Sequence, residues 1–267
     1  MIVYFIKMTI PNILHFVYGC KPQTQEFLFL DMTAILSAKA VHKPDTIYLH
    51  YFYEPYGKYW DILKSTGYVT LMKMDNMPTH IGKKEIKQYQ HIGDIIRLNS
   101  LKKYGGAYLD IDTISVNPFG ELLNNQFVMA KQYNMGLCNA IMLSEPNAKF
   151  VDIWLKRYEN FFKEDGWGES SITLPMLLAH SHPEHITVCH QDIFFTPCCN
   201  EAGQIFKDNT PENPRITTLH VWRLMHGDDY LNYDWKWIKE HPNALFTRYL
   251  NKALEQDEEV KRIYEGL

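Results

Sequence analysis

The feature that most constrains the fold is the alternation of short apolar segments with longer segments of helical periodicity. The predicted strands are residues 12–19, 45–52, 69–74, 107–114 and 140–144. The predicted helices are residues 27–40, 85–104, 148–163 and 172–180. Strands that alternate with helices in this way build a largely parallel sheet with helices on its faces. We therefore expect one α/β domain over residues 1–267, with a mostly parallel central sheet flanked by helices.

Composition and charge exclude several partners. Hydrophobic residues make up 46% and charged residues 22% of the chain, which is ordinary for a globular protein. A net charge of −4 argues against binding nucleic acid by neutralising phosphates. No apolar segment approaches the length of a transmembrane helix, and Lys7 interrupts the apolar N-terminal run. We therefore expect no membrane segment, no signal peptide and a cytoplasmic protein.

The five cysteines are odd in number and contain no C-x-x-C pair, which indicates a reducing compartment rather than a disulfide framework. Cys189, His190, Cys198 and Cys199 form the one cluster that suggests a zinc site. Buried thiols are the interpretation we favour for these cysteines.

The predicted helix at 85–104 carries apolar residues around most of its circumference. At 100° per residue this holds for Ile92, Ile95, Ile96, Leu98 and Leu101. A helix of this kind is buried. Asp94 and Arg97 are three residues apart on it, so their side chains can touch. Two interpretations stay open, a buried structural ion pair and part of a functional site.

The helix ends at Gly105 and Gly106, and the strand that follows carries the only Asp-x-Asp of the sequence, Asp110 and Asp112. Residues two apart in an extended strand point to the same side, so the two carboxylates repel each other. A hard divalent cation, Mg²⁺ or Mn²⁺, relieves that repulsion. Because α/β sheets bind ligands at the carboxyl ends of their strands, we expect Asp94 and Arg97 to share one end of the sheet with this pair.

Three classes of protein use such a pair of acids. The first is the class of enzymes that transfer a sugar from a nucleotide-diphosphate sugar. The second is the haloacid-dehalogenase type of phosphohydrolase. The third is a metal-dependent sugar-binding module without catalysis. The dehalogenase motif has Thr or Val at its fifth position, where this chain has Ile114, although residues 227–234 could imitate the later acidic motif of that family. We favour the first class.

The segment "HIGDIIRLNSLKKYGGAYLDIDTI" resembles the signature of the D-x-D glycosyltransferases of GT-A fold. These include initiating α-mannosyltransferases, α-1,4-galactosyl and N-acetylglucosaminyltransferases, and glucosylating cytotoxins. The family pattern is Asp-x-x-Arg on a helix, then Tyr-Gly-Gly-x-Tyr-x-Asp-x-Asp. The matching residues are Asp94, Arg97, Tyr104, Gly105, Gly106, Tyr108, Asp110 and Asp112. Looser similarities place Tyr18, Asn139, His220 and Trp222 at other family positions.

The resemblance implies a retaining hexosyltransferase that uses a UDP-sugar, or less favourably a GDP-sugar, with Mn²⁺ or Mg²⁺. The acceptor would be a glycan, a glycolipid or a protein. Residues 1–120 would form the nucleotide-sugar-binding half. Residues 121–267 would form the acceptor side and the late metal-binding elements.

The resemblance also implies roles for single residues. Asp110 and Asp112 would bind the metal together with either His220 or His226, because the Ser-Trp of many relatives is replaced here by Met225-His226. Asp94 and Arg97 would hold the sugar in the catalytic centre. The remaining substrate-binding candidates are Tyr18 as a platform for the base, Tyr108, Asn139, Glu169 and Trp222.

Glu169 lies in the segment 166–171, "GWGESS", whose glycines suit the hinges of a mobile flap on the acceptor side. The alternative interpretation is a helix start capped by Ser170 or Ser171.

Overall fold

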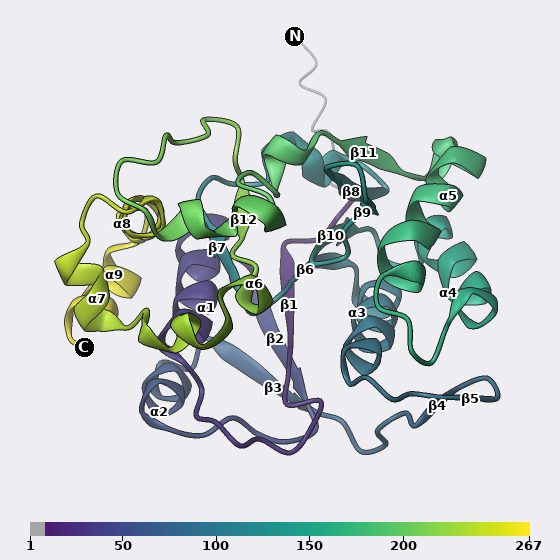
Figure 1. Ribbon diagram of the computed structural model, residues 1–267, viewed down its shortest axis with the longest axis horizontal. Helices are drawn as coiled ribbons and strands as arrows, with labels where there is room; N and C mark the ends of the chain where they lie inside the picture. The colour runs from purple at the N-terminus through teal and green to yellow at the C-terminus, as the bar shows by residue number, and fades with distance from the viewer. Residues whose placement is uncertain (1–8) are drawn as a thin grey trace, which may run out of the picture.

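The structure, a computed structural model, describes residues 9–267 and has a central sheet with helices on both faces (Figure 1). The strand order is β11-β8-β10-β6-β1-β2-β3. Neighbouring strands in this order are parallel except for β10, which runs antiparallel to both β6 and β8, and β9 pairs antiparallel with β8 beside this order. The expected α/β class with a mostly parallel sheet is therefore confirmed. The strands are β1 (Ile13–Tyr18), β2 (Thr46–Tyr51), β3 (Val69–Lys73), β4 (His80–Ile81), β5 (Lys84–Glu85), β6 (Gly106–Leu109), β7 (Thr113–Ser115), β8 (Phe127–Gln132), β9 (Gly136–Leu137), β10 (Ile141–Ser144), β11 (Thr187–Cys189) and β12 (Thr218–His220).

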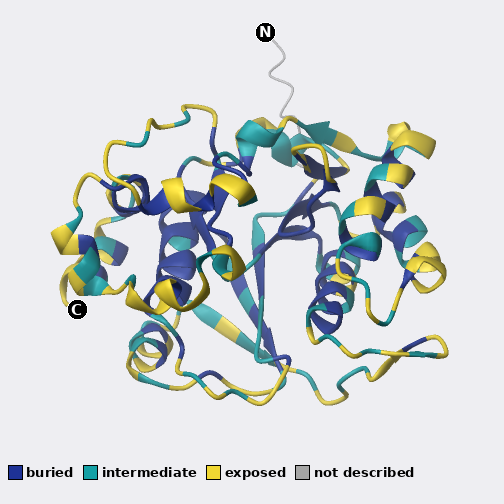
Figure 2. Cartoon of the chain, viewed as in Figure 1, coloured by how far each residue is buried: buried dark blue, intermediate teal, exposed yellow. Residues whose placement is uncertain are grey.

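Helices cover the two faces of the sheet separately. In Figure 1, α1 and the C-terminal helices lie on one side of β1, and α3, α4 and α5 lie on the other. The buried residues form a corresponding core on each side, and Figure 2 colours them dark blue. All residues of α1 except Lys39 are buried, because α1 packs against both β7 and α8. The helices are α1 (Phe29–His42), α2 (Lys58–Ser65), α3 (Gln90–Tyr104), α4 (Lys149–Phe161), α5 (Leu174–Ser181), α6 (Arg223–His226), α7 (Trp235–Glu240), α8 (Leu245–Leu254) and α9 (Glu258–Glu265).

Two predicted elements differ from the structure. The helix predicted at 85–104 begins only at Gln90, because residues 80–85 form the hairpin β4–β5. The strand predicted at 107–114 is two strands, β6 and β7, separated by a turn at Asp110–Asp112. That turn is imposed from outside the segment, because the Asp110 amide donates to the Ala140 carbonyl and the Val221 amide donates to the Asp112 carbonyl.

The segment 166–171 is part loop and part helix. A π-helical turn spans Glu169–Thr173, and neither Ser170 nor Ser171 caps it with its side chain. Both serines are buried instead.

None of the helices within residues 9–267 combines the length and the apolar character needed to cross a bilayer. The expectation that the N-terminal apolar run is not a signal peptide falls largely on residues 1–8, outside the described residues. The division of the chain at residue 120 stays a prediction.

Candidate metal and donor-sugar site

The acid pair, Asp110 and Asp112, lies in the turn that follows β6. The Asp110 amide donates to the Ala140 carbonyl at 2.8 Å, and the Thr113 hydroxyl donates to the Asp110 carbonyl at 2.9 Å. The sequence suggested that the pleat of one continuous strand positions the two acids. In the structure the backbone contacts of this turn position them instead. The turn lies at the carboxyl end of β6, the edge at which α/β sheets bind ligands.

His220 completes a candidate cation site with the acid pair. It ends β12, which pairs with β7 so that His220 lies opposite Thr113. Its Nε2 is 3.2 Å from Asp112 Oδ2, and one ligand atom each from Asp110, Asp112 and His220 lie within 4.8 Å of one another. His226, the other predicted third ligand, instead directs its Nε2 to the Val221 carbonyl at 2.9 Å. Across residues 9–267 no other group of His, Cys, Asp and Glu meets this geometry, and that includes the cysteine cluster considered for zinc.

The two acids are electrostatically unequal. Burial raises the pKa of Asp110 and outweighs the opposing Arg97 charge, while the neighbouring Asp112 adds to the increase. At Asp112 the effect of burial is outweighed by the charge and hydrogen bond of His220 and by the Arg223 amide, so that pKa is lowered. Burial acts against protonation of His220, but the Asp112 carboxylate overcomes it and raises the pKa of the imidazole. Two carboxylates on the turn and one imidazole at the end of β12 fit a divalent cation that prefers oxygen and nitrogen ligands.

Arg97 joins α3 to the acid pair. Its Nη1 is 3.1 Å from Asp110 Oδ1 and also donates to the Asn139 carbonyl at 2.9 Å. Its guanidinium lies over the Tyr108 ring, 4.4 Å from the centroid, and the Tyr108 hydroxyl donates to the same Asp110 oxygen at 2.6 Å. Arg97 and Tyr108 therefore fix the orientation of Asp110.

Asp94 lies on the other side of Arg97 and is only 5% exposed. Its Oδ1 accepts from the Asn139 amide at 2.7 Å and lies 3.6 Å from Arg97 Nε. Its Oδ2 accepts from the Tyr158 hydroxyl at 2.8 Å. Burial raises the pKa of Asp94, but these partners and His91 outweigh it, so the net shift is downward and the carboxylate is charged. The buried ion pair and the acid pair are thus one connected network.

Tyr18 and two residues that the sequence did not single out lie beside this network. Tyr18 ends β1 half-buried, with its ring edge-on to Phe27 at 5.1 Å between centroids. Its hydroxyl faces Asp31, a fully buried carboxylate in the first turn of α1. Burial raises the pKa of Asp31 to about 6, although Arg223 and the Leu28 amide oppose the shift.

Arg223 links Asp31 to the acid pair. Its guanidinium is 3.3 Å from Asp31 Oδ1, and its backbone amide donates to Asp112 Oδ2 at 2.8 Å. Asp31 could have been suspected from its place in the first turn of a predicted helix. Arg223 gave no local signal, because its contacts depend on residues far away in the sequence.

Trp222 and Glu169 were the remaining predicted substrate-binding residues. Trp222 is buried with its ring centroid 4.0 Å from that of His220, and its indole donates to the Pro197 carbonyl at 3.1 Å. Glu169 is partly exposed and pairs with Lys163 at 3.1 Å. Trp222 therefore packs against His220. Within residues 9–267 the ion-pair partner of Glu169 is Lys163, which does not belong to the acid-pair network.

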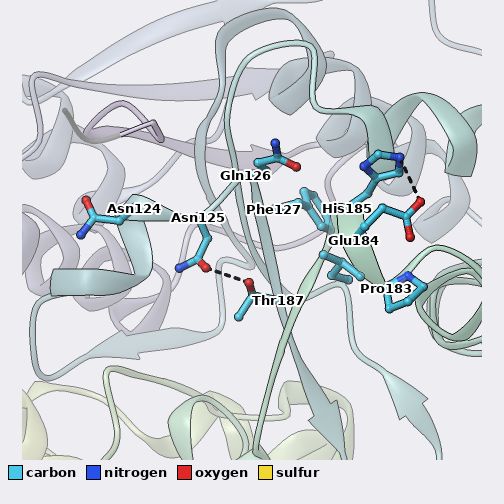
Figure 3. A pocket seen from close by; sticks show the side chains of 9 residues that line it. Asn124, Asn125, Gln126, Phe127, Pro183, Glu184, His185 and Thr187 are labelled. Atoms are coloured by element: carbon cyan, nitrogen blue, oxygen red, sulfur yellow. Dashed lines mark hydrogen bonds and ion pairs between the residues drawn. The ribbon is translucent and has the colours of Figure 1, made fainter. Parts of the chain in front are cut away.

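A hollow of about 290 Å³ lies between residues 124–127 and residues 183–187 (Figure 3). It adjoins the first residues of β8 and β11, which are parallel. Since β6 and β8 are both antiparallel to β10, the hollow lies at the sheet edge opposite the acid pair. Two pairs of its side chains interact, Thr187 with Asn125 at 2.7 Å and His185 with Glu184 at 3.3 Å.

Comparison with known proteins gives three findings. Residues 31–131 match the family described as the glycosyltransferase sugar-binding region containing a DXD motif. The protein named glucan organizing enzyme 1 from Cryptococcus neoformans var. grubii is 35% identical over 207 residues, which cover 71% of this chain and 55% of that protein. The chain thus spans about half the length of this relative. The apo form of the glycosyltransferase GlyE from Streptococcus pneumoniae has a TM-score of 0.50 at 15% identity, over 94% of this chain and 64% of that one.

The similarity to GlyE is one of fold, whereas the family match includes Asp94, Arg97 and the acid pair. The resemblance stated from the sequence is confirmed: residues 31–131 match the DXD-containing sugar-binding region of the glycosyltransferases, and the chain has the GT-A fold.

Proposed function

We propose that this chain is a metal-dependent retaining glycosyltransferase. It would move a hexose from a nucleotide-diphosphate sugar, a UDP-sugar in preference to a GDP-sugar, to a hydroxyl group of a glycan, glycolipid or protein. The observation that carries the proposal is the Asp110, Asp112 and His220 cluster at the carboxyl end of β6, within a DXD region. The name of the fungal relative, glucan organizing enzyme, supports a glycan as the acceptor.

Asp110, Asp112 and His220 would hold the cation. The imidazole favours Mn²⁺ over Mg²⁺, because Mg²⁺ is usually held by carboxylates, phosphates and water. When bound, such a cation neutralises a diphosphate and stabilises the negative charge that grows on it as the glycosidic bond breaks.

The other predicted residues divide between the two ends of the donor. Tyr18 would stack on the base, and Asp94 with Arg97 would fix the sugar hydroxyls. Tyr108 and Asn139 hold Asp110 and Asp94 in place, and Trp222 packs on His220. Residues 1–120 would form the nucleotide-sugar-binding half, and residues 121–267 would form the acceptor side, with Glu169, and the late metal-binding elements. Departure of the nucleotide and attack by the acceptor would use the same face of the sugar, with the leaving phosphate assisting.

The test is a panel of UDP- and GDP-sugars, with Mn²⁺, Mg²⁺ or neither, read as nucleotide release. We expect slow hydrolysis of a UDP-hexose that requires the cation, even without an acceptor. UDP with Mn²⁺ should also raise the melting temperature, because a ligand that binds only the folded state stabilises it.

Two results would replace this function by another. Hydrolysis of acetyl phosphate without any effect of nucleotides would indicate a phosphohydrolase of the dehalogenase type. Stabilisation by a glycan alone, with no turnover of any nucleotide sugar, would indicate a non-catalytic sugar-binding module.

A further inference from the structure

The loop 162–168, between α4 and the π-helical turn, is fastened to residues 84–91. Lys84 Nζ donates to the Phe162 carbonyl at 2.6 Å. Lys87 Nζ pairs with Asp165 at 3.1 Å and with Glu164 at 3.3 Å, but its side chain is 45% exposed. Exposed ion pairs of this kind contribute little, because water and salt screen them. Lys84 reaches only the first residue of the loop, so the middle of the loop needs a less exposed attachment than Lys87 to be held firmly.

His91 provides that attachment, in the first turn of α3. Its ring is 3% exposed and stands edge-on to Phe162, with 4.9 Å between centroids. Its Nε2 is 2.9 Å from the Gly166 carbonyl, and since a carbonyl only accepts, Nε2 carries the hydrogen. Its Nδ1 lies 3.5 Å from Asp94 Oδ2 and 3.4 Å from the Tyr158 hydroxyl. One buried ring therefore bridges the loop and the acid of the Asp-x-x-Arg pattern.

We propose that His91 is a positioning residue that couples the loop 162–168 to Asp94, so that ordering the loop and orienting Asp94 toward the donor sugar are one event. The part of this inference that concerns the sugar rests on the proposed function. The coupling between the loop and Asp94 does not, because both ends are present in the protein without donor.

The groups that face His91 decide its charge. Asp94 and, behind it, Arg97 come from α3, Tyr158 comes from α4, and Glu169 comes from the π-helical turn. Burial lowers the pKa of His91, but the Asp94 hydrogen bond, the Gly166 carbonyl and the charges of Asp94 and Glu169 outweigh it, so the net shift is upward. An imidazole with a raised pKa stabilises the fold below its unfolded value of about 6.5, and this stabilisation is lost as pH rises through the folded value. The loop should accordingly be held more firmly at a pH below the unfolded value than at a pH above the folded value.

Three substitutions separate the two ends of the ring. His91→Gln places an amide nitrogen near the Nε2 position and can keep the loop contact. His91→Asn places one near the Nδ1 position and can keep the contact with Asp94, whereas His91→Ala keeps neither. Lys87→Ala is the matched control, because it releases a loop contact without touching Asp94.

The first measurement is amide hydrogen exchange of residues 162–173 in the protein without ligand, corrected for intrinsic rates, between pH 5.5 and 8.5. We expect His91→Ala and His91→Asn to raise exchange about tenfold, the scale of one lost charged hydrogen bond, and His91→Gln to raise it less. Asp94→Asn should also loosen the loop and add little to His91→Ala, since both break one connection. Lys87→Ala should change exchange less than twofold. In the parent the corrected exchange rate of the loop amides should rise with pH. In His91→Ala this rise with pH should be absent.

The second measurement is KM for the nucleotide sugar beside Kd for UDP with Mn²⁺. All three His91 variants should have a KM above the parental value, because the coupling needs both ends of the ring. Their affinity for UDP should stay within about twofold of the parental value. If His91→Ala leaves loop exchange unchanged, or changes it no more than Lys87→Ala does, the inference is wrong. It is equally wrong if KM rises and UDP affinity falls together, in proportion to a loss of melting temperature. A parent that turns over no nucleotide sugar contradicts the proposed function, whereas the exchange data still decide whether His91 couples the loop to Asp94.

Discussion

Asp110 and Asp112 are two residues apart, yet their side chains meet different partners. Asp110 contacts Arg97 and Tyr108. When Asp110 is neutralised, the charge of Arg97 is still paired with Asp94. Asp112 contacts His220 and the Arg223 amide. Substituting each acid should therefore have the same effect on a bound cation and different effects on stability.

We expect Asp110→Asn and Asp112→Asn each to lower metal-dependent nucleotide release by at least about 10²-fold, the scale of losing one preorganised charge-stabilising group. Without metal, Asp110→Asn should change the free energy of unfolding by less than about 1 kcal/mol, because it removes an acid whose pKa burial has raised. Asp112→Asn should cost about 1–3 kcal/mol, because it takes the charge partner from His220. Urea unfolding and nucleotide release check this, with Asp61→Asn as the exposed control. A large stability loss in Asp110→Asn would indicate a structural role.

Tyr18 is half-buried, so its ring can serve either the core or a bound base. We expect Tyr18→Ala to weaken UDP binding by about 1–3 kcal/mol, the range measured for base–aromatic stacking, and Tyr18→Trp to be tolerated. Titration calorimetry with UDP and Mn²⁺ measures this. Tyr68→Ala, which changes a partly buried tyrosine that bonds to Glu259, should leave the affinity unchanged. Equal affinity in Tyr18→Ala and the parent would assign Tyr18 to the core.

At the scale of elements, the junction between α3 and β6 depends on a close backbone approach. Gly106 opens β6 with φ +96°, and a Cβ at this position would lie 2.3 Å from the Ile13 carbonyl oxygen. The approach is close because β6 pairs with β1 at this point, with Ala107 opposite Leu14. Neither strand can shift without disturbing the turn that carries the acid pair.

Gly106→Ala should therefore destabilise the protein by more than about 3 kcal/mol, since strain in the left-handed region adds to a clash with backbone. Gly67 provides the control, because its φ is +69° and an added Cβ would have no neighbour within 4 Å. Gly67→Ala should cost only about 1–2 kcal/mol, the strain of the backbone conformation alone. Urea unfolding of the two variants compares them. Equal losses would show that the contact with Ile13 is not what constrains Gly106.

The elements that could be predicted from sequence are those with a strong local pattern. The helices α1 and α4 and the strands β1, β2 and β3 lie within a few residues of their predicted positions. The helix α2 was missed because only Trp60 and Leu63 of its eight residues are buried. The break between β6 and β7 was missed because Ala140 and Val221, distant in sequence, determine it.

The site followed the same rule. Asp94, Arg97, Asp110 and Asp112 carry a spaced motif and meet as expected. The contacts of Arg223 and His91 with Asp31 and Gly166 are tertiary, so no spacing in the sequence indicates them.

At the scale of the whole molecule, three histidines are buried in the region of the central sheet and α1. They are His15, His42 and His50. His42 bonds to the Ser115 hydroxyl, and the rings of His15 and His50 bond to each other. Burial lowers the pKa of His15 to about 4 and those of His42 and His50 to about 3. All three are therefore neutral in the folded protein at neutral pH.

A histidine with a lowered pKa contributes stability that is complete above its unfolded value of about 6.5 and is lost as pH falls toward the folded value, because the unfolded chain binds the proton first. We expect the difference in unfolding free energy between the parent and His50→Gln to shrink by on the order of 3 kcal/mol between pH 7.5 and pH 4. Chemical denaturation across this range measures the difference. His80→Gln, at an exposed position, should show no such trend. A constant difference for His50→Gln would mean that His50 is not neutral in the fold.

The contact between the Arg223 amide and the Asp112 carboxylate joins residues 111 positions apart in sequence. On a ribosome, which adds about 5–20 residues per second, the acid pair would therefore emerge several seconds before His220 and Arg223. During that interval the growing chain holds Asp110 and Asp112 without His220, and no cation site can close around them. A nascent chain that stops before His220 would carry the whole Asp-x-Asp motif without a complete site. The complete cluster of Asp110, Asp112 and His220 therefore forms late in synthesis, when β12 pairs with β7.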